Sequence, residues 1–341
     1  MAAVGVPGTI YVYEPKRTLP LFVYNSARGG TNDDNSNTTT SNDNDSSPQN
    51  ILLFVGGMWD ALATTPYVAT LADYLSSSSN GSKWTVVHPL LSSSARQFGI
   101  SSLDEDVAEI STAIDFVRST PSLGTSSASR VVLMGHSTGC QDGAIIQAPV
   151  SDRESMLHAI ATRAACRAAA DECNRIAATT PPDAHATTLL PYHLTRLFVS
   201  SVPMLISRWL SLMSPSSPEQ PGDDDKFSSD LGADVLAHTF GHVVASSPRG
   251  VAGRAEIHPA SGIVGSAKHN LAGEAFAERW ARLVDLPERV LTYLDEVVGG
   301  RQTNDAGRGV GQEAWARWRR QKEALEQERE QNKVGKYQTD D

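Results

Sequence analysis

Cysteine is scarce in this sequence, and its scarcity excludes two classes of protein. Only three of the 341 residues are cysteines, Cys140, Cys166 and Cys173, and no two of them form a C-x-x-C pair. A small, odd number of unpaired cysteines is atypical both of a disulfide-stabilised secreted protein and of a structural zinc site. The sequence therefore predicts reduced thiols, no bound metal and no organic cofactor.

An excess of basic residues is also missing. The chain has 29 Lys and Arg residues against 39 Asp and Glu residues, which gives a formal net charge of -10. A nucleic-acid surface needs clustered positive charge to neutralise phosphates. We expect a small-molecule or protein partner and no nucleic acid.

Long apolar runs are absent as well. No stretch of about 18 apolar residues occurs, although a membrane-spanning helix needs roughly 20. Residues 1–22 contain no charged segment followed by an apolar one, the pattern of a secretory signal. We expect a soluble, non-secreted, cytoplasmic protein that does not associate with membranes. The sequence does not predict its oligomeric state.

The most informative stretch is an apolar run that ends in a G-x-S-x-G motif. Residues 130–134 read RVVLM, and residues 135–139 read GHSTG. A run rich in β-branched residues that ends at glycine is typical of a buried parallel strand. The glycines permit a sharp turn that would expose the Ser137 hydroxyl at the carboxyl edge of a sheet. We predict that Ser137 is a catalytic nucleophile; the alternative is an ordinary turn with a solvent-exposed serine.

A second strand-to-glycine junction lies earlier in the chain. Residues 51–55 form an apolar run that continues into Gly56-Gly57-Met58. Acyl-transfer hydrolases place main-chain N–H groups of an oxyanion hole at such a junction. We predict that the N–H groups of Met58 and Thr138 stabilise an oxyanion; the alternative is a plain strand-end turn.

Strand and helix patterns alternate along the first half of the chain. Apolar strand patterns occupy residues 9–13, 19–24, 51–55, 84–91 and 131–135, and helical patterns occupy residues 65–76 and 103–117. The second helix is expected to bury Val107, Ile110, Ile114 and Val117. This alternation predicts an α/β fold with a doubly wound, mostly parallel sheet.

The order breaks after the motif. Residues 143–150 resemble another buried strand, but only five residues separate Ser137 from it, whereas a parallel crossover usually needs about a dozen. Either residues 139–146 form a helix in place of the strand, or the two strands are joined directly. The spacing favours the helix.

The remaining segments divide by composition. Residues 26–50 are almost entirely polar and are expected to be a disordered insertion in an α/β domain that spans residues 1–300. Residues 152–174 are Ala-rich and helical in pattern. The apolar residues 194–213 indicate a helical cap within residues 190–235; the alternative is a core helix. Residues 301–341 are expected to form a charged tail, helical or disordered.

A late histidine completes the candidate catalytic pair. His269 follows Ser137 in the order that serine, acid and histidine take in α/β-hydrolases, so it is our candidate general base. Eight other histidines are present, and the alternative is that His269 is structural or solvent-exposed.

Several segments together resemble a known family. The chain resembles a fungal α/β-hydrolase family, long described only as a domain of unknown function, that includes esterases of fusarinine-type siderophores. The similar segments are residues 53–60, 90–94 with 98–104, 134–142, 147–154, 208–212 and 223–231. The resemblance implies a serine esterase with a helical cap, in which Ser137 attacks an ester of a hydroxamate siderophore and His269 is the base.

Two departures from the family pattern concern the catalytic machinery. Family members carry a helical segment after the G-C-Q-D stretch at residues 139–142, and an apolar strand with a following acid before the histidine; neither is recognisable here. The triad acid is therefore unassigned, and Asp152, at the end of a candidate strand, is our substitute. The predicted function is that of a serine carboxylester hydrolase. The alternatives are a catalytically impaired hydrolase-like protein with a binding role, and a non-hydrolytic transferase that uses the same nucleophile.

Overall fold

The computed structural model describes residues 5–24, 50–76, 84–95, 97–123, 125, 129–142, 145–220, 222–223, 228, 231, 264, 268–295, 323 and 327. Residues 26–49 of the predicted insertion, the region before His269 in which the family carries its acid, and nearly all of the tail lie outside the described residues. The domain boundaries predicted above therefore stay predictions.

The described residues form a six-stranded, mostly parallel sheet. The strands are β1 (Gly8–Glu14), β2 (Leu19–Tyr24), β3 (Asn50–Val55), β4 (Trp84–Pro89), β5 (Val131–His136) and β6 (Ile145–Gln147), in the order β1-β2-β4-β3-β5-β6. Strands β1 and β2 form an antiparallel hairpin, and β2 pairs antiparallel with β4. Strands β4, β3, β5 and β6 run parallel to one another. This confirms the predicted sheet.

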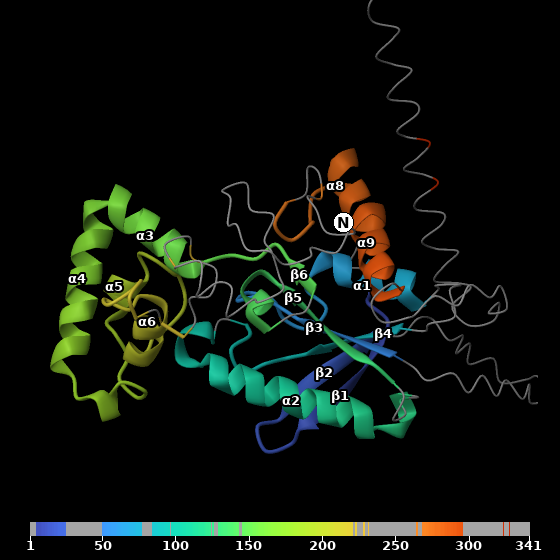
Figure 1. The fold of residues 1–341 in the computed structure, drawn as a ribbon, viewed down its shortest axis with the longest axis horizontal. Coiled ribbons are helices and arrows are strands. Elements are labelled where there is room, and N and C mark those ends of the chain that lie inside the picture. The colour runs from blue at the N-terminus through green and yellow to red at the C-terminus, as the bar shows by residue number, and fades with distance from the viewer. Residues whose placement is uncertain are drawn as a thin grey trace, which may run out of the picture.

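Helices cover both faces of the sheet (Figure 1). On one face pack α1 (Pro66–Ser76), α8 (Phe276–Trp280), the π-helical turn η5 (Ala281–Asp285) and α9 (Leu286–Tyr293); on the other lies α2 (Leu103–Ser119). Leu52 and Phe54 of β3 face α1, while Leu53 and Val55 face α2, and all four are buried. Burial on both faces explains why β3 reads as a continuous apolar run.

Helix α2 corrects one predicted core position. Val107 is 54% exposed, because it lies about 100° around the helix from the buried stripe formed by Ile110, Ala113 and Val117. Glu109 is buried instead. Its carboxylate accepts hydrogen bonds from the Ser92 N–H at 2.7 Å and the Ser92 hydroxyl at 2.6 Å, and it pairs with Arg17.

The remaining helices gather at one end of the molecule (Figure 1). They are α3 (Asp152–Thr162), α4 (Ala164–Thr179), α5 (Tyr192–Thr195) and α6 (Ile206–Leu212). Three short 3-10 turns lie between the described elements: η1 (Phe98–Ile100) between β4 and α2, η2 (Pro121–Leu123) between α2 and β5, and η4 (Pro182–Ala184) between α4 and α5. The helices share their own core around Cys173, Met204 and Trp209, to which Met58 and Phe98 from the sheet side also belong. This helical cap thus packs directly on the loop that follows β3.

The connection between β5 and β6 overturns the helix that the spacing favoured. A six-residue 3-10 turn, η3 (Ser137–Asp142), leads to β6, which pairs parallel with β5 from Met134↔Ile145 to His136↔Gln147. Only three residues pair, so the chain has to return by only about 10 Å at 3.3 Å per residue. A full crossover helix is needed for longer strands, and for this reason the dozen-residue rule gave the wrong prediction.

None of the helices in the described part of the chain is both long enough and apolar enough to cross a membrane.

Candidate active site

Ser137 occupies the sharp turn at the carboxyl end of β5. Its backbone φ is 56°, in the left-handed region that a non-glycine residue adopts only where its surroundings enforce it. The strand before it and η3 after it hold this conformation. The turn has the strained strand-to-helix geometry of a nucleophile elbow, with a 3-10 turn in place of the usual helix.

Two glycines make this turn possible by allowing close backbone approach. A Cβ on Gly139 would lie 2.5 Å from the carbonyl oxygen of Gly56. A Cβ on Gly57 would lie 2.7 Å from Cβ of Ser137. The loop after β3 and the serine turn after β5 therefore pack against each other, which explains why glycines follow both strands.

His269 faces the nucleophile. Its Nε2 lies 2.8 Å from Oγ of Ser137. The histidine belongs to a turn in which the Leu271 N–H donates to the carbonyl of Lys268, and the Leu271 side chain is buried in the core that contains α1 and α9. The structure thus brings together the predicted nucleophile and the predicted base.

The surroundings keep the His269 imidazole neutral at pH 7. Partial burial lowers its pKa from the usual value of 6.5, the charge of His136 lowers it further, and the carboxylate of Asp60 acts in the opposite direction. A neutral imidazole can accept the proton of a serine hydroxyl.

Asp152 is the first residue of helix α3, and it directly follows Ser151, whose hydroxyl caps that helix. Within the described residues, no carboxylate hydrogen-bonds to Nδ1 of His269, whose side chain contacts Ser137 through Nε2. The role of Asp152 as triad acid stays a prediction.

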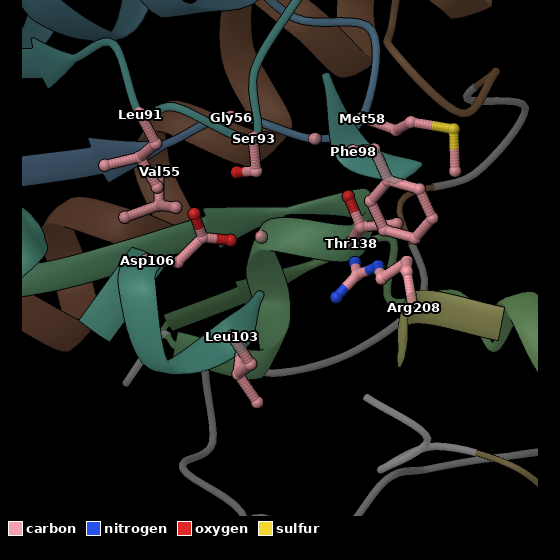
Figure 2. Close-up of a pocket in the computed structure, with 12 residues that line it drawn as sticks. Val55, Gly56, Met58, Leu91, Ser93, Phe98, Leu103, Asp106, Thr138 and Arg208 are labelled. Atoms are coloured by element: carbon pink, nitrogen blue, oxygen red, sulfur yellow. The ribbon is translucent and has the colours of Figure 1, made fainter. Parts of the chain in front are cut away.

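The two predicted oxyanion-hole residues line one small cavity beside the nucleophile (Figure 2). Met58 comes from the loop after β3, and Thr138 immediately follows Ser137. The cavity volume is about 20 Å³, roughly enough for one water molecule. Met58 and Thr138 thus line the same cavity, and their two N–H groups stay our predicted donors.

The same cavity is lined by polar side chains that the sequence analysis did not single out. Arg208 of α6 is 4% exposed, and its guanidinium carbon lies 3.9 Å from the centre of the Phe98 ring. Figure 2 shows the two side chains next to each other. Ser93 and Asp106 lie on the opposite side. No motif could have identified them, because they converge from the cap, a loop and α2.

A second polar pair lies behind the nucleophile. Nδ1 of His136 is 2.6 Å from Oδ2 of Asp60, which also accepts the Gly57 N–H at 2.7 Å. Burial alone would raise the pKa of Asp60, but the hydrogen bond and charge of His136 hold it below its usual value. The neighbouring His88 is fully buried, which lowers its pKa to about 4 and keeps it neutral.

Metal-binding chemistry is not indicated by the part of the chain that the structure describes. It contains no group of three or more His, Cys, Asp or Glu side chains arranged to hold a metal ion. Cys140, Cys166 and Cys173 are buried and unpaired with one another.

Comparison with known sequences identifies the family. Residues 31–142 and 142–251 match the family described as "Protein of unknown function (DUF1749)". The chain belongs to this family. The two matched segments meet at Asp142, the last residue of the 3-10 turn that follows the nucleophile.

Named relatives of this DUF1749 chain are fungal. An alignment of 234 positions with fusarinine C esterase sidJ of Aspergillus fumigatus is 36% identical and covers 56% of this chain and 65% of that protein. The match thus spans just under two thirds of the relative's length. An alignment of 337 positions with esterase AN6793 of Emericella nidulans is 28% identical and covers 74% of this chain and 88% of that protein.

A solved structure confirms the fold. Siderophore hydrolase EstB from Aspergillus fumigatus superimposes with a TM-score of 0.63 at 32% identity, covering 87% of this chain and 99% of the other. The predicted α/β-hydrolase-like fold is therefore correct.

Proposed function

We propose that this chain is a serine carboxylester hydrolase. The observation that carries the proposal is the 2.8 Å contact between Nε2 of His269 and Oγ of Ser137, with the serine held at a φ of 56° at the end of a parallel strand. A nucleophile and a base within hydrogen-bond distance are the minimal requirement for acyl transfer through a covalent intermediate. The esterase names of the relatives support the same reaction class.

In this mechanism Ser137 attacks the ester carbonyl while His269 accepts the hydroxyl proton. The resulting oxyanion would lie in the cavity lined by Met58 and Thr138, where their N–H groups stabilise it. His269 then returns the proton to the leaving alcohol, and the ester C–O bond breaks. A water molecule, deprotonated by the same imidazole, releases the acid from Ser137.

We further propose that the substrate is an ester-linked hydroxamate siderophore of the fusarinine type. The names of two relatives support this substrate class, since one is a fusarinine C esterase and the other a siderophore hydrolase. The part of sidJ that aligns with this chain is 65% of its length.

The test is hydrolysis of fusarinine C by the purified chain, followed by mass spectrometry. Each cleaved ester adds one water to the mass, and we expect stepwise opening and release of monomers by the wild type but not by Ser137→Ala. A simple aryl ester serves as a parallel substrate. Turnover of the aryl ester alone would retain the esterase and reject the siderophore; turnover of neither, by folded protein, would reject both.

One observation favours a second candidate, a catalytically impaired relative that binds a ligand. Among the described residues no carboxylate contacts Nδ1 of His269, and the nucleophile is followed by a six-residue 3-10 turn rather than a long helix. In this case the wild type would bind fusarinine C, as measured by calorimetry, without cleaving it.

A further inference from the structure

Two side-chain nitrogens converge on the main-chain carbonyl of His269. Nε2 of His136 lies 3.3 Å from this oxygen, and Nε2 of Gln147 lies 3.4 Å from it. His136 ends β5 and Gln147 ends β6, and the two residues are direct partners in the parallel ladder. The short crossover thus places both nitrogens beside the segment that carries the candidate base.

The orientation of Gln147 is fixed by a buried tyrosine. The Tyr67 hydroxyl lies 3.1 Å from Oε1 of Gln147, and Tyr67 is completely buried in the core. Because the phenol O–H donates to the amide oxygen, the amide nitrogen is turned toward the carbonyl of His269. Gln147 therefore acts as a donor at this position.

The orientation of His136 is fixed by Asp60. The 2.6 Å contact to Nδ1 is short for a hydrogen bond between a ring nitrogen and a carboxylate, and His136 is 3% exposed. With Nδ1 held at the carboxylate of Asp60, Nε2 on the other side of the ring is directed at the carbonyl oxygen of His269. Since Asp60 also accepts the Gly57 N–H, one carboxylate ties the loop after β3 to the histidine next to the nucleophile.

We propose that His136 and Gln147 form a carbonyl clamp that positions His269 against Ser137, with Asp60 as the anchor of the clamp. All three are positioning residues, and the inference rests on the serine hydrolase function proposed above. In most triads an acid on Nδ1 orients the histidine ring. Here, among the described residues, His136 and Gln147 instead hold the main-chain carbonyl of His269. The pairing register of β5 and β6 sets the positions of these two side chains.

The test removes one donor of the clamp without leaving a buried hydroxyl unpaired. Tyr67→Phe supplies the reference background, and Tyr67→Phe/Gln147→Met then deletes the amide at nearly constant volume. Circular dichroism and thermal unfolding establish that both variants fold. We expect the double variant to lower kcat about tenfold relative to the reference, because a shift of about 1 Å can cost 10²-fold and one of two donors is retained.

The same variants should separate positioning from binding. We expect KM to change less than twofold, and labelling of Ser137 by a fluorophosphonate to slow by the same factor as kcat. A kcat and a labelling rate within twofold of the reference would overturn the clamp.

A readout that does not depend on turnover distinguishes failure of the proposed clamp from failure of the proposed function. In a crystal structure of the double variant, we expect Nε2 of His269 to move beyond hydrogen-bond distance of Oγ of Ser137. A separation that stays at 2.8 Å would overturn the clamp whether or not the wild-type chain is an esterase.

Conservative replacement of the anchor supplies a second test. Asn at position 60 retains an acceptor for the Gly57 N–H and for Nδ1 of His136, whereas Leu retains none. We expect Asp60→Asn to keep kcat within about tenfold of the wild type and Asp60→Leu to lose about 100-fold. Equal losses in the two variants would show that the carboxylate does not act through these hydrogen bonds.

Discussion

Replacement of Gly57 by alanine should impair catalysis far more than stability. The added Cβ would lie 2.7 Å from Cβ of Ser137 and 3.2 Å from its Oγ. Carbon atoms in contact are normally about 3.5–4.0 Å apart, so the loop and the serine turn have to separate by about 1 Å. The φ of Gly57 lies outside the left-handed region, so the clash itself is the main penalty.

A displacement of this size acts directly on the reacting atoms. A misplacement of about 1 Å can lower kcat/KM by about 10²-fold. Overpacking of this kind destabilises a protein by about 1–3 kcal/mol, which leaves most of the chain folded at 25 °C. Ester hydrolysis kinetics and urea denaturation of Gly57→Ala would measure the two effects separately.

Gly5→Ala is the matched control, because a Cβ at Gly5 would meet no atom within 4 Å. We expect the control to retain wild-type kinetics and stability. The reasoning is refuted if kcat/KM of folded Gly57→Ala lies within threefold of the control, since the loop after β3 would then not determine the position of the nucleophile.

Three further predictions concern the base and the core. In a pH–rate profile, kcat/KM should rise with pH to a plateau, and the midpoint of the rise should lie below pH 6.5. The reason is that the pKa of His269 is lowered, so the base is neutral at pH values above this midpoint; a midpoint above pH 7 would contradict this. Glu109→Ala should lower the free energy of unfolding by about 1–3 kcal/mol in urea titrations, since the part-buried N–H of Ser92 loses its acceptor, and a change below about 0.5 kcal/mol would show that water replaces the carboxylate. Phe54→Ala should cost about 3–5 kcal/mol in the same assay, whereas Val107→Ala, at a 54% exposed position, should change stability by less than about 0.5 kcal/mol; similar losses at both positions would contradict the observed core.

The sheet could be predicted from the sequence because its central strands are apolar. Residues 51–55 are buried and residues 131–134 are partly or fully buried, so both stretches read as uninterrupted apolar runs, and Gly56 and Gly135 mark where the runs end. The face of α2 was harder to predict. Val107 matches the apolar spacing, but Glu109 takes a buried position because Ser92 and Arg17 satisfy its carboxylate, and spacing alone does not reveal those partners.

The path of the chain after the nucleophile could not be predicted from general rules. The minimum length of a crossover assumes that the chain returns along the whole strand, whereas β6 pairs with only the last three residues of β5. Sequence spacing contains no information on how many residues will pair. The prediction of a helix over residues 139–146 was therefore wrong for a definite geometric reason.

The site was partly accessible from the sequence. Ser137 was found from a local motif, and His269 from its order in the chain. The hydrogen bonds of Asp60 and Gln147 were not foreseen, because their partners lie 76 and 122 residues away in the chain and are brought together only by the sheet. Asp152 was chosen for its place after a candidate strand, and its role awaits experiment.

Labelling with a fluorophosphonate tests the central claim most directly, because this probe reacts only with a serine whose neighbouring base activates it. The wild-type chain, Ser137→Ala and His269→Ala would be compared after circular dichroism has shown that all three are folded. The account predicts labelling of the wild type, none of Ser137→Ala, and a rate at least about 10³-fold lower for His269→Ala. Equal labelling of wild type and Ser137→Ala, or no labelling of folded wild type, would contradict the assignment of Ser137 as an activated nucleophile.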